Sequence, residues 1–441
     1  MDLYLEDASG FKGYADREFS PSTEAELVEI LGNASRDCIP VTVAGARTGL
    51  TGGSVPQGGW AISMEKFQRL DVSTGCAIAG AGVSLEALQS AASRCNQFYA
   101  PDPTERTASI GGSIATNASG SRSFRYGSAR KHVLGLRVAL IDGRVLHVKR
   151  GAKVDFPVTQ IPLPNTTKNT AGYLLSPGMD WVDLFTGSEG TLGIVVEAEL
   201  RLLPRPAGVL AGVVFFPSDQ DALAAVDRWR NVERLRMLEY FDRNSLAVLR
   251  QKYSEVPADA GAALLVEQEQ GDIDFWAEQA AEDSWFAETD QDRERFRRFR
   301  HALPELVNDT VRRRGFLKVN SDYAVPLDRN REMLAHYHRL LEEQVLDYVI
   351  FGHIGDAHVH VNILPRSQAD FENGQRLMLE FARKAVELGG TVSAEHGLGK
   401  RKSHLLEFQY TVAQIEAMKN VKRRLDPQWL LNRGNLFPAP V

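Results

Sequence analysis

Hydrophobic positions in the first part of the chain form short runs separated by glycine-rich turns. This pattern predicts helices at residues 27–35 and 85–95, a buried strand at 40–43 and a hairpin over 133–149. Ser84 is a suitable N-cap for the second helix. Asp142-Gly143 favours the tight turn of the hairpin. Residues 1–206 are therefore expected to form an α+β domain with long, ordered glycine loops.

The pattern changes after residue 206. It predicts strands at 209–216, 235–241, 262–268, 346–351 and 358–364, and helices at 218–229, 291–314 and 329–343. Strands and helices alternate here without the glycine signature of a parallel sheet, so residues 207–390 are expected to form an antiparallel sheet covered by helices. Residues 391–441 predict a mostly helical segment that packs on the first domain and completes the functional site.

Composition and charge exclude several classes of protein. With 441 residues the chain is expected to form about two or three domains. The net charge of −6 argues against nucleic-acid binding and against a polybasic membrane anchor. No run of about 18 apolar residues occurs, so at most peripheral membrane contact is expected. Cys38, Cys76 and Cys95 form no CxxC pair, which disfavours an iron–sulfur or structural zinc module and predicts reduced thiols in the cytoplasm.

Three loops of small residues carry the first candidate chemistry. They cover residues 44–54, 110–120 and 184–194. Glycines let backbone amides approach a ligand closely, and consecutive free amides form a nest for an anion such as a pyrophosphate. The first loop alone is equally compatible with an ordinary surface loop, because it lacks both the P-loop pattern and the GxGxxG fingerprint. Three such loops in one section indicate a long ligand with phosphates and a ring system.

The densest cluster of functional residues lies near the C-terminus. His353, His358 and His360 lie within a stretch of eight residues, and Glu395-His396 follows about one helix later. Alternation along a strand places His358 and His360 on one face, and a Gly-Asp turn can fold His353 back beside them. Two imidazoles and a carboxylate are the ligands of a catalytic divalent metal, with zinc expected and manganese or iron left open. The alternative is a set of hydrogen-bonded histidines without a metal.

Taken together, these segments resemble the flavin-binding family of vanillyl-alcohol oxidase and p-cresol methylhydroxylase. Within it, the chain resembles the FAD-linked D-2-hydroxyacid dehydrogenases, which include D-lactate dehydrogenase, the glycolate oxidase D subunit and D-2-hydroxyglutarate dehydrogenase. The resemblance implies a two-part FAD-binding domain over residues 1–206, an antiparallel-sheet substrate (cap) domain over 207–390 and a C-terminal segment over 391–441.

The resemblance also implies an FAD site in the first domain, with the pyrophosphate at the first loop. The implied cofactor residues are Gly45, Ala46, Arg47, Thr48, Gly49, Gly52, Gly53, Ser54, Pro101, Gly111, Gly112, Thr116, Asn117, Gly120, Glu189, Ile194 and Asn432. Arg47 stands where the family usually has glycine, and it either pairs with a phosphate or caps the loop. Relatives that attach flavin covalently tend to carry histidine at the position of Thr48, so a dissociable FAD is expected.

For the metal, the resemblance implies His353, His360 and Glu395 as ligands. The family usually has asparagine where His358 stands, so His358 is an additional ligand, a residue behind the ligands or a surface histidine. The resemblance implies His396 as the catalytic base, which would take the hydroxyl proton as hydride leaves C2 for flavin N5. The alternative role of His396 is to orient Glu395.

Substrate recognition is less defined by the sequence. Arg300 aligns with an arginine that grips carboxylate in hydroxyglutarate enzymes, although a solvated basic face on helix 291–314 explains it equally well. Related enzymes place a lysine two residues before an aspartate in this segment, and here that position is Asn320, with Lys318 two residues earlier. Pro304 stands where the hydroxyglutarate enzymes have a hydroxyl residue. Asn362 matches a substrate-contacting asparagine. These departures leave the identity of the 2-hydroxy acid open.

The chain is therefore expected to be an FAD enzyme that oxidises a D-2-hydroxy acid, such as a D-lactate-like acid or glycolate, to the 2-oxo acid. The acceptor is expected to be electron-transferring flavoprotein, a quinone or an iron–sulfur subunit rather than NAD, whose fingerprint is missing. Two alternatives remain, an oxygen-using alcohol or aldonolactone oxidase of the same fold and a non-catalytic flavin-binding subunit of a glycolate oxidase-like complex. The expected location is the cytoplasm or the inner membrane surface, and a homodimer is left open.

Overall fold

A computed structural model of the chain describes residues 5–287 and 289–438. Its N-terminal part contains a three-stranded parallel sheet of order β1-β3-β2 and a five-stranded antiparallel sheet of order β4-β5-β9-β7-β8. The strands are β1 (Arg17–Phe19), β2 (Val41–Ala44), β3 (Trp60–Ser63), β4 (Leu70–Ser73), β5 (Cys76–Gly80), β7 (Val133–Ala139), β8 (Val145–Lys149) and β9 (Ile194–Arg201). These two sheets confirm the two-part α+β architecture.

Short helices and one small strand pair complete this part. The helices are α1 (Glu24–Arg36), α2 (Leu85–Arg94), α3 (Ile110–Ala115), α4 (Ser123–Tyr126) and α5 (Trp181–Phe185), and β6 (Gln97–Phe98) pairs with β10 (Leu203–Pro204). The predicted N-cap at Ser84 is confirmed, because its side chain accepts from the amide of Ala87. The first helix begins three residues before its predicted start, because Thr23 caps it through the amide of Glu26.

The second part is one seven-stranded sheet of order β14-β11-β13-β12-β16-β17-β15, in which every pair is antiparallel. Its strands are β11 (Val209–Phe216), β12 (Leu235–Asp242), β13 (Ala262–Glu269), β14 (Trp285–Ala287), β15 (Val319–Asn320), β16 (Tyr348–Gly352) and β17 (His360–Ile363). Its helices are α6 (Asp219–Trp229), α7 (Arg243–Leu249), α8 (Ile273–Gln279), α9 (Asp290–Arg313), α10 (Asn330–Glu343) and α11 (Gln368–Glu387). The predicted antiparallel sheet covered by helices is confirmed.

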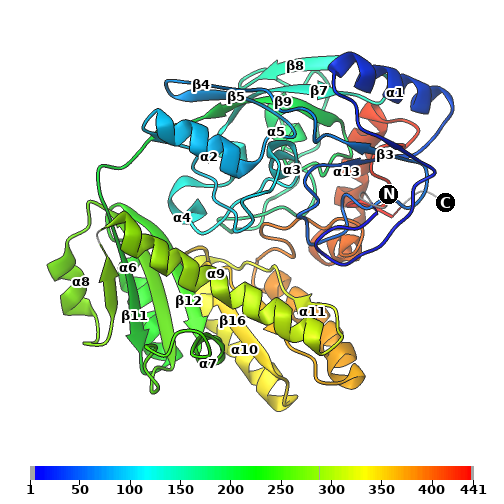
Figure 1. Ribbon diagram of the computed structural model, residues 1–441. Coiled ribbons are helices and arrows are strands. Elements are labelled where there is room, and N and C mark those ends of the chain that lie inside the picture. Colours follow the sequence, from blue (N-terminus) through cyan, green and yellow to red (C-terminus); the bar gives the residue numbers. More distant parts are fainter. Residues whose placement is uncertain (1–4, 288, 439–441) are drawn as a thin grey trace.

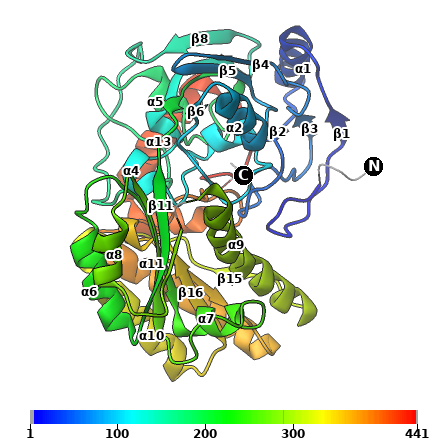
Figure 2. The ribbon, with the colours of Figure 1, turned by 60° about the vertical axis from the view of Figure 1, so that its left-hand side comes forward.

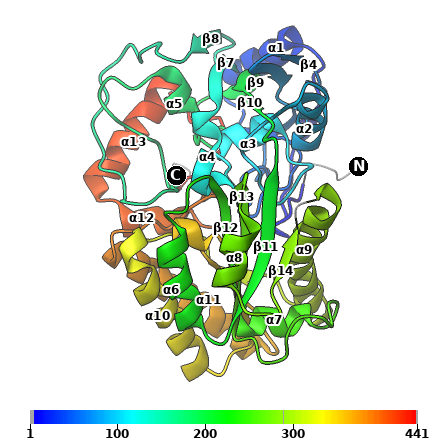
Figure 3. The ribbon, with the colours of Figure 1, turned by 90° about the vertical axis from the view of Figure 1, so that its left-hand side faces the viewer.

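Helices cover both faces of this sheet, with α6, α10 and α11 on one side and α7 and α9 on the other (Figure 3). Because helices cover both faces of the sheet, β11 is apolar and buried along its whole length. Val213 and Phe215 belong to the core that includes Phe299 of α9, whereas Phe216 packs on Trp229 of α6 with ring centroids 5.7 Å apart. Because successive side chains of a strand point to opposite faces, both sets must be apolar.

The C-terminal segment, with α12 (Leu406–Gln409) and α13 (Val412–Leu425), returns to the N-terminal part, where α13 lies beside α5 (Figures 1 and 3). The side chain of Lys422 is only 2% exposed, and its Nζ donates to the carbonyls of Thr191 (2.6 Å) and Leu431 (2.9 Å) and to Asp426 (2.5 Å). Within the described ranges, no helix is long and apolar enough to cross a membrane.

Replacement of Lys422 by methionine is expected to destabilise the protein by about 3–5 kcal/mol, because it leaves the Asp426 carboxylate buried without its cation. Urea unfolding followed by circular dichroism measures this change. Lys419→Met, at a half-buried position on the same helix, is the control and should change the unfolding free energy by less than about 0.5 kcal/mol. Equal stability of Lys422→Met and the parent would contradict the structural role of this ion pair.

Candidate active site

The turn between β16 and β17 assembles three histidines. Gly352, just before His353, has φ +131°, and Ala357, just before His358, has φ +50°. The chain turns between the two histidines, where the amides of Asp356 and His358 donate to the carbonyl of His353. The ring of His353 consequently lies 5.4 Å from that of His358 and 5.5 Å from that of His360, centroid to centroid. The predicted return of His353 toward the other two histidines is confirmed. The strand itself begins at His360 rather than at 358, and His358 makes an isolated bridge to Ala324.

Glu395 lies at the centre of this cluster. Its Oε1 is 3.3 Å from Nε2 of His353, 3.2 Å from Nε2 of His360 and 3.6 Å from Nε2 of His396. Ligand atoms of His353, His358, His360 and Glu395 all lie within 4.8 Å of one another. The tertiary structure therefore brings together the three predicted metal ligands, the predicted base and the extra histidine.

The other oxygen of Glu395 contacts a buried lysine. Nζ of Lys168 and Oγ of Ser119 each lie 3.0 Å from Oε2 of Glu395, and Lys168 also lies 3.5 Å from Asp356. Burial alone would raise the pKa of Glu395, but the charges of Lys168 and His353 hold that pKa well below its usual value. Glu395 is therefore a carboxylate at neutral pH, the form that binds a cation.

A second carboxylate holds His353 from behind. Oε1 of Glu239 lies 2.5 Å from Nδ1 of His353, and Oε2 accepts from Nε of Arg300 at 3.0 Å. Burial alone would raise the pKa of Glu239, but His353 and Arg300 lower it to about 2. The interpretation of Arg300 as part of a solvated basic face is wrong, because it is only 7% exposed and paired with Glu239.

Asp322 organises the remaining two histidines. Its Oδ1 lies 3.2 Å from Nε2 of His358 and 3.6 Å from Nδ1 of His396, and its Oδ2 accepts from the backbone amide of His396 at 2.9 Å. His358 is 0% exposed, so the alternative of a surface histidine is wrong. Burial lowers the pKa of His358 and of His360 to about 4 and also lowers that of His396. All three rings are therefore neutral at pH 7.

Three members of this network, Glu239, Lys168 and Asp322, were missed by the sequence analysis. A usable signal existed for Glu239, because it lies between Leu238 and Tyr240 in a predicted strand, and a buried charge in a strand requires a partner. Asp322 lies in the segment 318–326 that resembles related enzymes, but that resemblance pointed to a lysine position and not to Asp322 as a site residue, and nothing in the sequence next to Lys168 marks Lys168. Both reach the cluster from loops that are distant in sequence, so only the tertiary fold reveals them.

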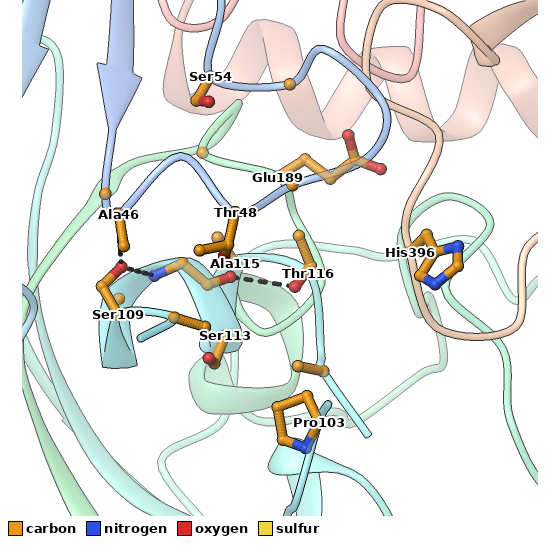
Figure 4. Close-up of a pocket in the computed structure, with 18 of the residues that line it drawn as sticks. Ala46, Thr48, Ser54, Pro103, Ser109, Ser113, Ala115, Thr116, Glu189 and His396 are labelled. Atoms are coloured by element: carbon orange, nitrogen blue, oxygen red, sulfur yellow. Dashed lines mark hydrogen bonds between the residues drawn. The ribbon is translucent and has the colours of Figure 1, made fainter. Parts of the chain in front are cut away.

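A cavity runs from the glycine loops to this cluster (Figure 4). Fourteen predicted cofactor residues line it, namely Gly45, Ala46, Arg47, Thr48, Gly49, Gly53, Ser54, Gly111, Gly112, Thr116, Gly120, Glu189, Ile194 and Asn432. His353, Glu395 and His396 line the same cavity. A ligand that occupies the loops therefore also faces the histidine–carboxylate cluster.

The loops meet closely at the floor of this cavity. Ser109 caps α3 through the amide of Gly112, and its Oγ also accepts from the amide of Ala46 at 3.3 Å. A Cβ on Gly45 would lie 2.2 Å from this Oγ, so only glycine permits the contact. Oγ of Ser113 is buried in the lining and has no hydrogen-bond partner among the described residues, which fits a polar ligand at this position.

Seven predicted site residues do not line this cavity, namely Gly52, Pro101, Asn117, Arg300, Lys318, His360 and Asn362. Asn117 adopts φ +51° and accepts from the amide of Arg130 at 3.0 Å, so it shapes the loop. Asn362 is buried in β17, and Lys318 is half-buried with a pKa lowered to about 8 by burial, Lys402 and Arg300. Their contacts with cofactor or substrate stay predictions.

Glu189 joins the glycine-loop side of the cavity to the loop that carries Glu395 and His396. Its carboxylate accepts from the amides of Leu398 (2.7 Å) and Gly399 (2.8 Å), and burial raises its pKa to about 7. The position of His396 against the cavity therefore depends on a contact that spans about 200 residues of sequence.

Comparison with known proteins agrees with this geometry. Residues 205–436 match the family described as FAD linked oxidases, C-terminal domain, and residues 15–149 match an FAD binding domain. The chain belongs to this FAD-linked oxidase family and is an FAD-dependent oxidoreductase.

Its relatives include a D-lactate dehydrogenase of Archaeoglobus fulgidus, 33% identical over 94% of this chain and 90% of the relative. A D-2-hydroxyglutarate dehydrogenase of Xanthomonas citri pv. viticola is 31% identical over 95% of this chain and 88% of the relative. The glycolate oxidase subunit GlcD of Bacillus subtilis is 29% identical over 99% of this chain and 92% of the relative. A solved alkyldihydroxyacetonephosphate synthase shares the fold with a TM-score of 0.69 at 15% identity, over 94% of this chain and 75% of that structure.

Proposed function

We propose that the protein oxidises a D-2-hydroxy acid to the corresponding 2-oxo acid with metal assistance and passes the electrons to an acceptor other than NAD. One observation carries the proposal: His353, Glu395 and His396 line the same cavity as the glycine loops of the FAD-binding part. Relatives named as D-lactate dehydrogenase and D-2-hydroxyglutarate dehydrogenase support the substrate class. Electron-transferring flavoprotein, a quinone and an iron–sulfur subunit are the acceptor classes we consider.

His353, His360 and Glu395 would hold the divalent cation, with zinc as our first choice. The donor set fits, because two imidazoles and one ionised carboxylate converge within 4.8 Å. A bound cation would act as a Lewis acid toward the hydroxyl and carboxylate of the substrate. His358 lies beside these ligands and is held by Asp322, so we place it as a fourth contact or a support of the site.

His396 is the residue that accepts the hydroxyl proton in this proposal. Its ring is neutral because burial lowers its pKa, and its Nε2 points toward Glu395 at 3.6 Å. Asp322 holds the backbone amide of His396 and faces its Nδ1, which orients the ring. Bound FAD supplies the hydride acceptor. The residues around it exclude water and align the hydroxy acid with that acceptor.

The FAD is expected to dissociate, because Thr48 has no nucleophilic imidazole with which to attach the flavin. Precipitation of the purified protein with acid should release all the yellow flavin into the supernatant, where its absorbance is measured. Flavin absorbance that stays with the washed pellet would contradict this expectation.

Anaerobic titration of the purified flavoprotein with D- and L-2-hydroxy acids tests the function. D-Lactate, D-2-hydroxyglutarate and glycolate form the panel, and L-lactate is the stereochemical control. The expected result is bleaching of the flavin absorbance near 450 nm, a general property of reduced flavins, by at least one D-acid or glycolate and not by L-lactate. Unchanged absorbance with every acid in metal-replete protein would refute the proposed reaction.

Glu239→Gln tests the positioning of His353. A carboxylate on the far nitrogen of a ligating histidine fixes its tautomer, and loss of such a partner costs about 10–100-fold in metal affinity. The expected result is a rise of this size in the metal dissociation constant, measured by competition with a chromogenic chelator. Glu267→Gln, also on the sheet but outside the cluster, is the control. Identical metal affinities of parent and Glu239→Gln would remove Glu239 from the site.

A further inference from the structure

A second cavity of about 660 Å³ lies between the two halves of the molecule. One wall comes from α2, β6 and the loop at residues 102–106, and the other comes from β11, β12, β13 and α9. Figure 2 shows α2 above α9 on this side of the molecule. Pro103 and Thr104 line both this cleft and the flavin cavity, so the two cavities adjoin there.

The lining of this cleft is strongly basic, although the chain as a whole carries a net charge of −6. Its arginines outnumber its carboxylates by eight to four. The arginines are Arg94, Arg106, Arg122, Arg205, Arg236, Arg293, Arg297 and Arg300, and the carboxylates are Asp102, Glu267, Asp290 and Glu294. A concave surface lined by one sign of charge concentrates ligands of the opposite sign.

Helix α9 distributes its arginines unevenly. Arg293, Arg297 and Arg300 follow i, i+4, i+7 spacing and line the cleft, where they are half-buried or buried. Arg295 and Arg298 do not line it and are exposed. The charged pattern of this helix is therefore not a uniform solvated face, because one of its faces supplies cations to the cleft.

Arg236 is a buried cation at the back of the cleft. It is 6% exposed, its Nε has no hydrogen-bond partner among the described residues, and Glu269 lies 3.7 Å away. Its guanidinium lies 5.6 Å from the centroid of the Phe98 ring. The ion pair with Glu269 is too long for a hydrogen bond, so an anionic group in the cleft would supply an acceptor for this guanidinium.

A half-buried histidine lies among these arginines. His301 lines the same cleft, and burial together with the charges of Arg300 and Arg297 lowers its pKa to about 4. The carboxylates of Asp102 and Glu294 act in the opposite direction but do not restore that pKa. The eight arginines and four carboxylates give the lining a formal charge of +4 at neutral pH, although Glu239 and Glu269, outside the lining, pair with Arg300 and Arg236.

We infer that this cleft binds a small molecule with two or more carboxylate or phosphate groups, at a site separate from the hydroxy-acid site. The volume lies in the range of small-molecule sites, about 300–1,000 Å³. Guanidinium groups suit carboxylate and phosphate because their planar forks match both oxygens. Since Pro103 and Thr104 belong to both cavities, the bound anion would lie beside the flavin cavity.

Isothermal titration calorimetry of the FAD-saturated protein tests the inference. Benzene-1,3,5-tricarboxylate is the first probe, because its carboxylates are too far apart to chelate one metal ion, and inorganic phosphate is the second. The expected result is saturable binding of at least one probe that weakens with added salt. Stronger binding of the tricarboxylate identifies a carboxylate ligand, and stronger binding of phosphate identifies a phosphate ligand.

Matched variants localise the binding. Arg297→Gln on one wall and Arg94→Gln on the other should each weaken it about tenfold or more. Arg298→Gln, one residue along α9 and outside the lining, should leave it unchanged, and so should Glu395→Gln. An unchanged flavin spectrum verifies that each variant is folded.

Three results would overturn the inference. The first is that neither probe binds at millimolar concentration. The second is that Arg297→Gln and Arg298→Gln change the affinity for the probe equally, and the third is that Glu395→Gln abolishes probe binding. The last result would place the anion in the hydroxy-acid site. The calorimetric titration requires no turnover, so the probe can bind to the cleft even if the proposed oxidation of a hydroxy acid fails.

Discussion

His396→Gln is expected to lower the rate of substrate-driven flavin reduction about 10²–10⁴-fold, the usual contribution of a positioned general base. The ring lines the cavity beside Glu395, and Asp322 fixes its backbone and faces its Nδ1. Glutamine retains a polar side chain of similar length but cannot accept a proton at neutral pH. Anaerobic stopped-flow measurement of the flavin absorbance gives the rate, and the spectrum before mixing reports FAD binding.

The same base predicts a direction for the pH dependence. A base must be unprotonated to act, so the rate falls as pH drops through the pKa of His396. Because burial lowers that pKa, the acid limb of the profile should lie below pH 6.5, the ordinary value for histidine. The residual rate of His396→Gln should lack this limb. His404→Gln, at an exposed histidine outside the cavity lining, should preserve both the rate and the limb. A His396→Gln rate within threefold of the parent, about 0.7 kcal/mol in activation free energy, would assign the proton transfer to another group.

Glu395→Gln is expected to remove the bound metal and, with it, substrate-driven flavin reduction. The carboxylate is the only anionic member of the proposed ligand set, and its Oε1 contacts both ligand histidines. We expect metal affinity to fall more than about 100-fold, beyond the effect of removing a group behind a ligand. Metal analysis by plasma mass spectrometry after gel filtration measures the occupancy per chain.

Stability supplies an independent readout for this variant. Lys168 is buried and 3.0 Å from Glu395, so glutamine leaves that cation with Asp356 as its remaining carboxylate partner. Unfolding of metal-free protein should therefore require about 3–5 kcal/mol less free energy, the usual effect of breaking a buried ion pair. Glu387→Gln, at an exposed position at the end of α11, is the control. Parent-like metal content in Glu395→Gln would exclude Glu395 as a ligand.

Much of the fold followed from periodicity alone. The apolar run of β11 and the helical spacing of α2 and α6 are local patterns, and their caps at Ser84 and Ser218 are local hydrogen bonds. Helix α9 was predicted to within one residue at either end, although Pro304 lies inside it. The start of α1 was missed because the capping contact of Thr23 outweighs the absence of apolar residues in the first turn.

The order of residues along the chain indicates which residue types carry the chemistry, because each glycine loop and the His353–His360 cluster is a continuous stretch of sequence. That Lys168, Glu239 and Asp322 complete the site is visible only in the tertiary structure, since the position of Glu239 in a strand indicates that it needs a partner but not which one. The tertiary structure also decided that the arginines of α9 line a cleft, because a helix face acquires its neighbours only when the two halves pack together. Burial is the physical reason for the charged residues of the site and for the arginines of the cleft. A charged side chain that is removed from water needs a partner, and the fold decides which residue is near enough to be that partner.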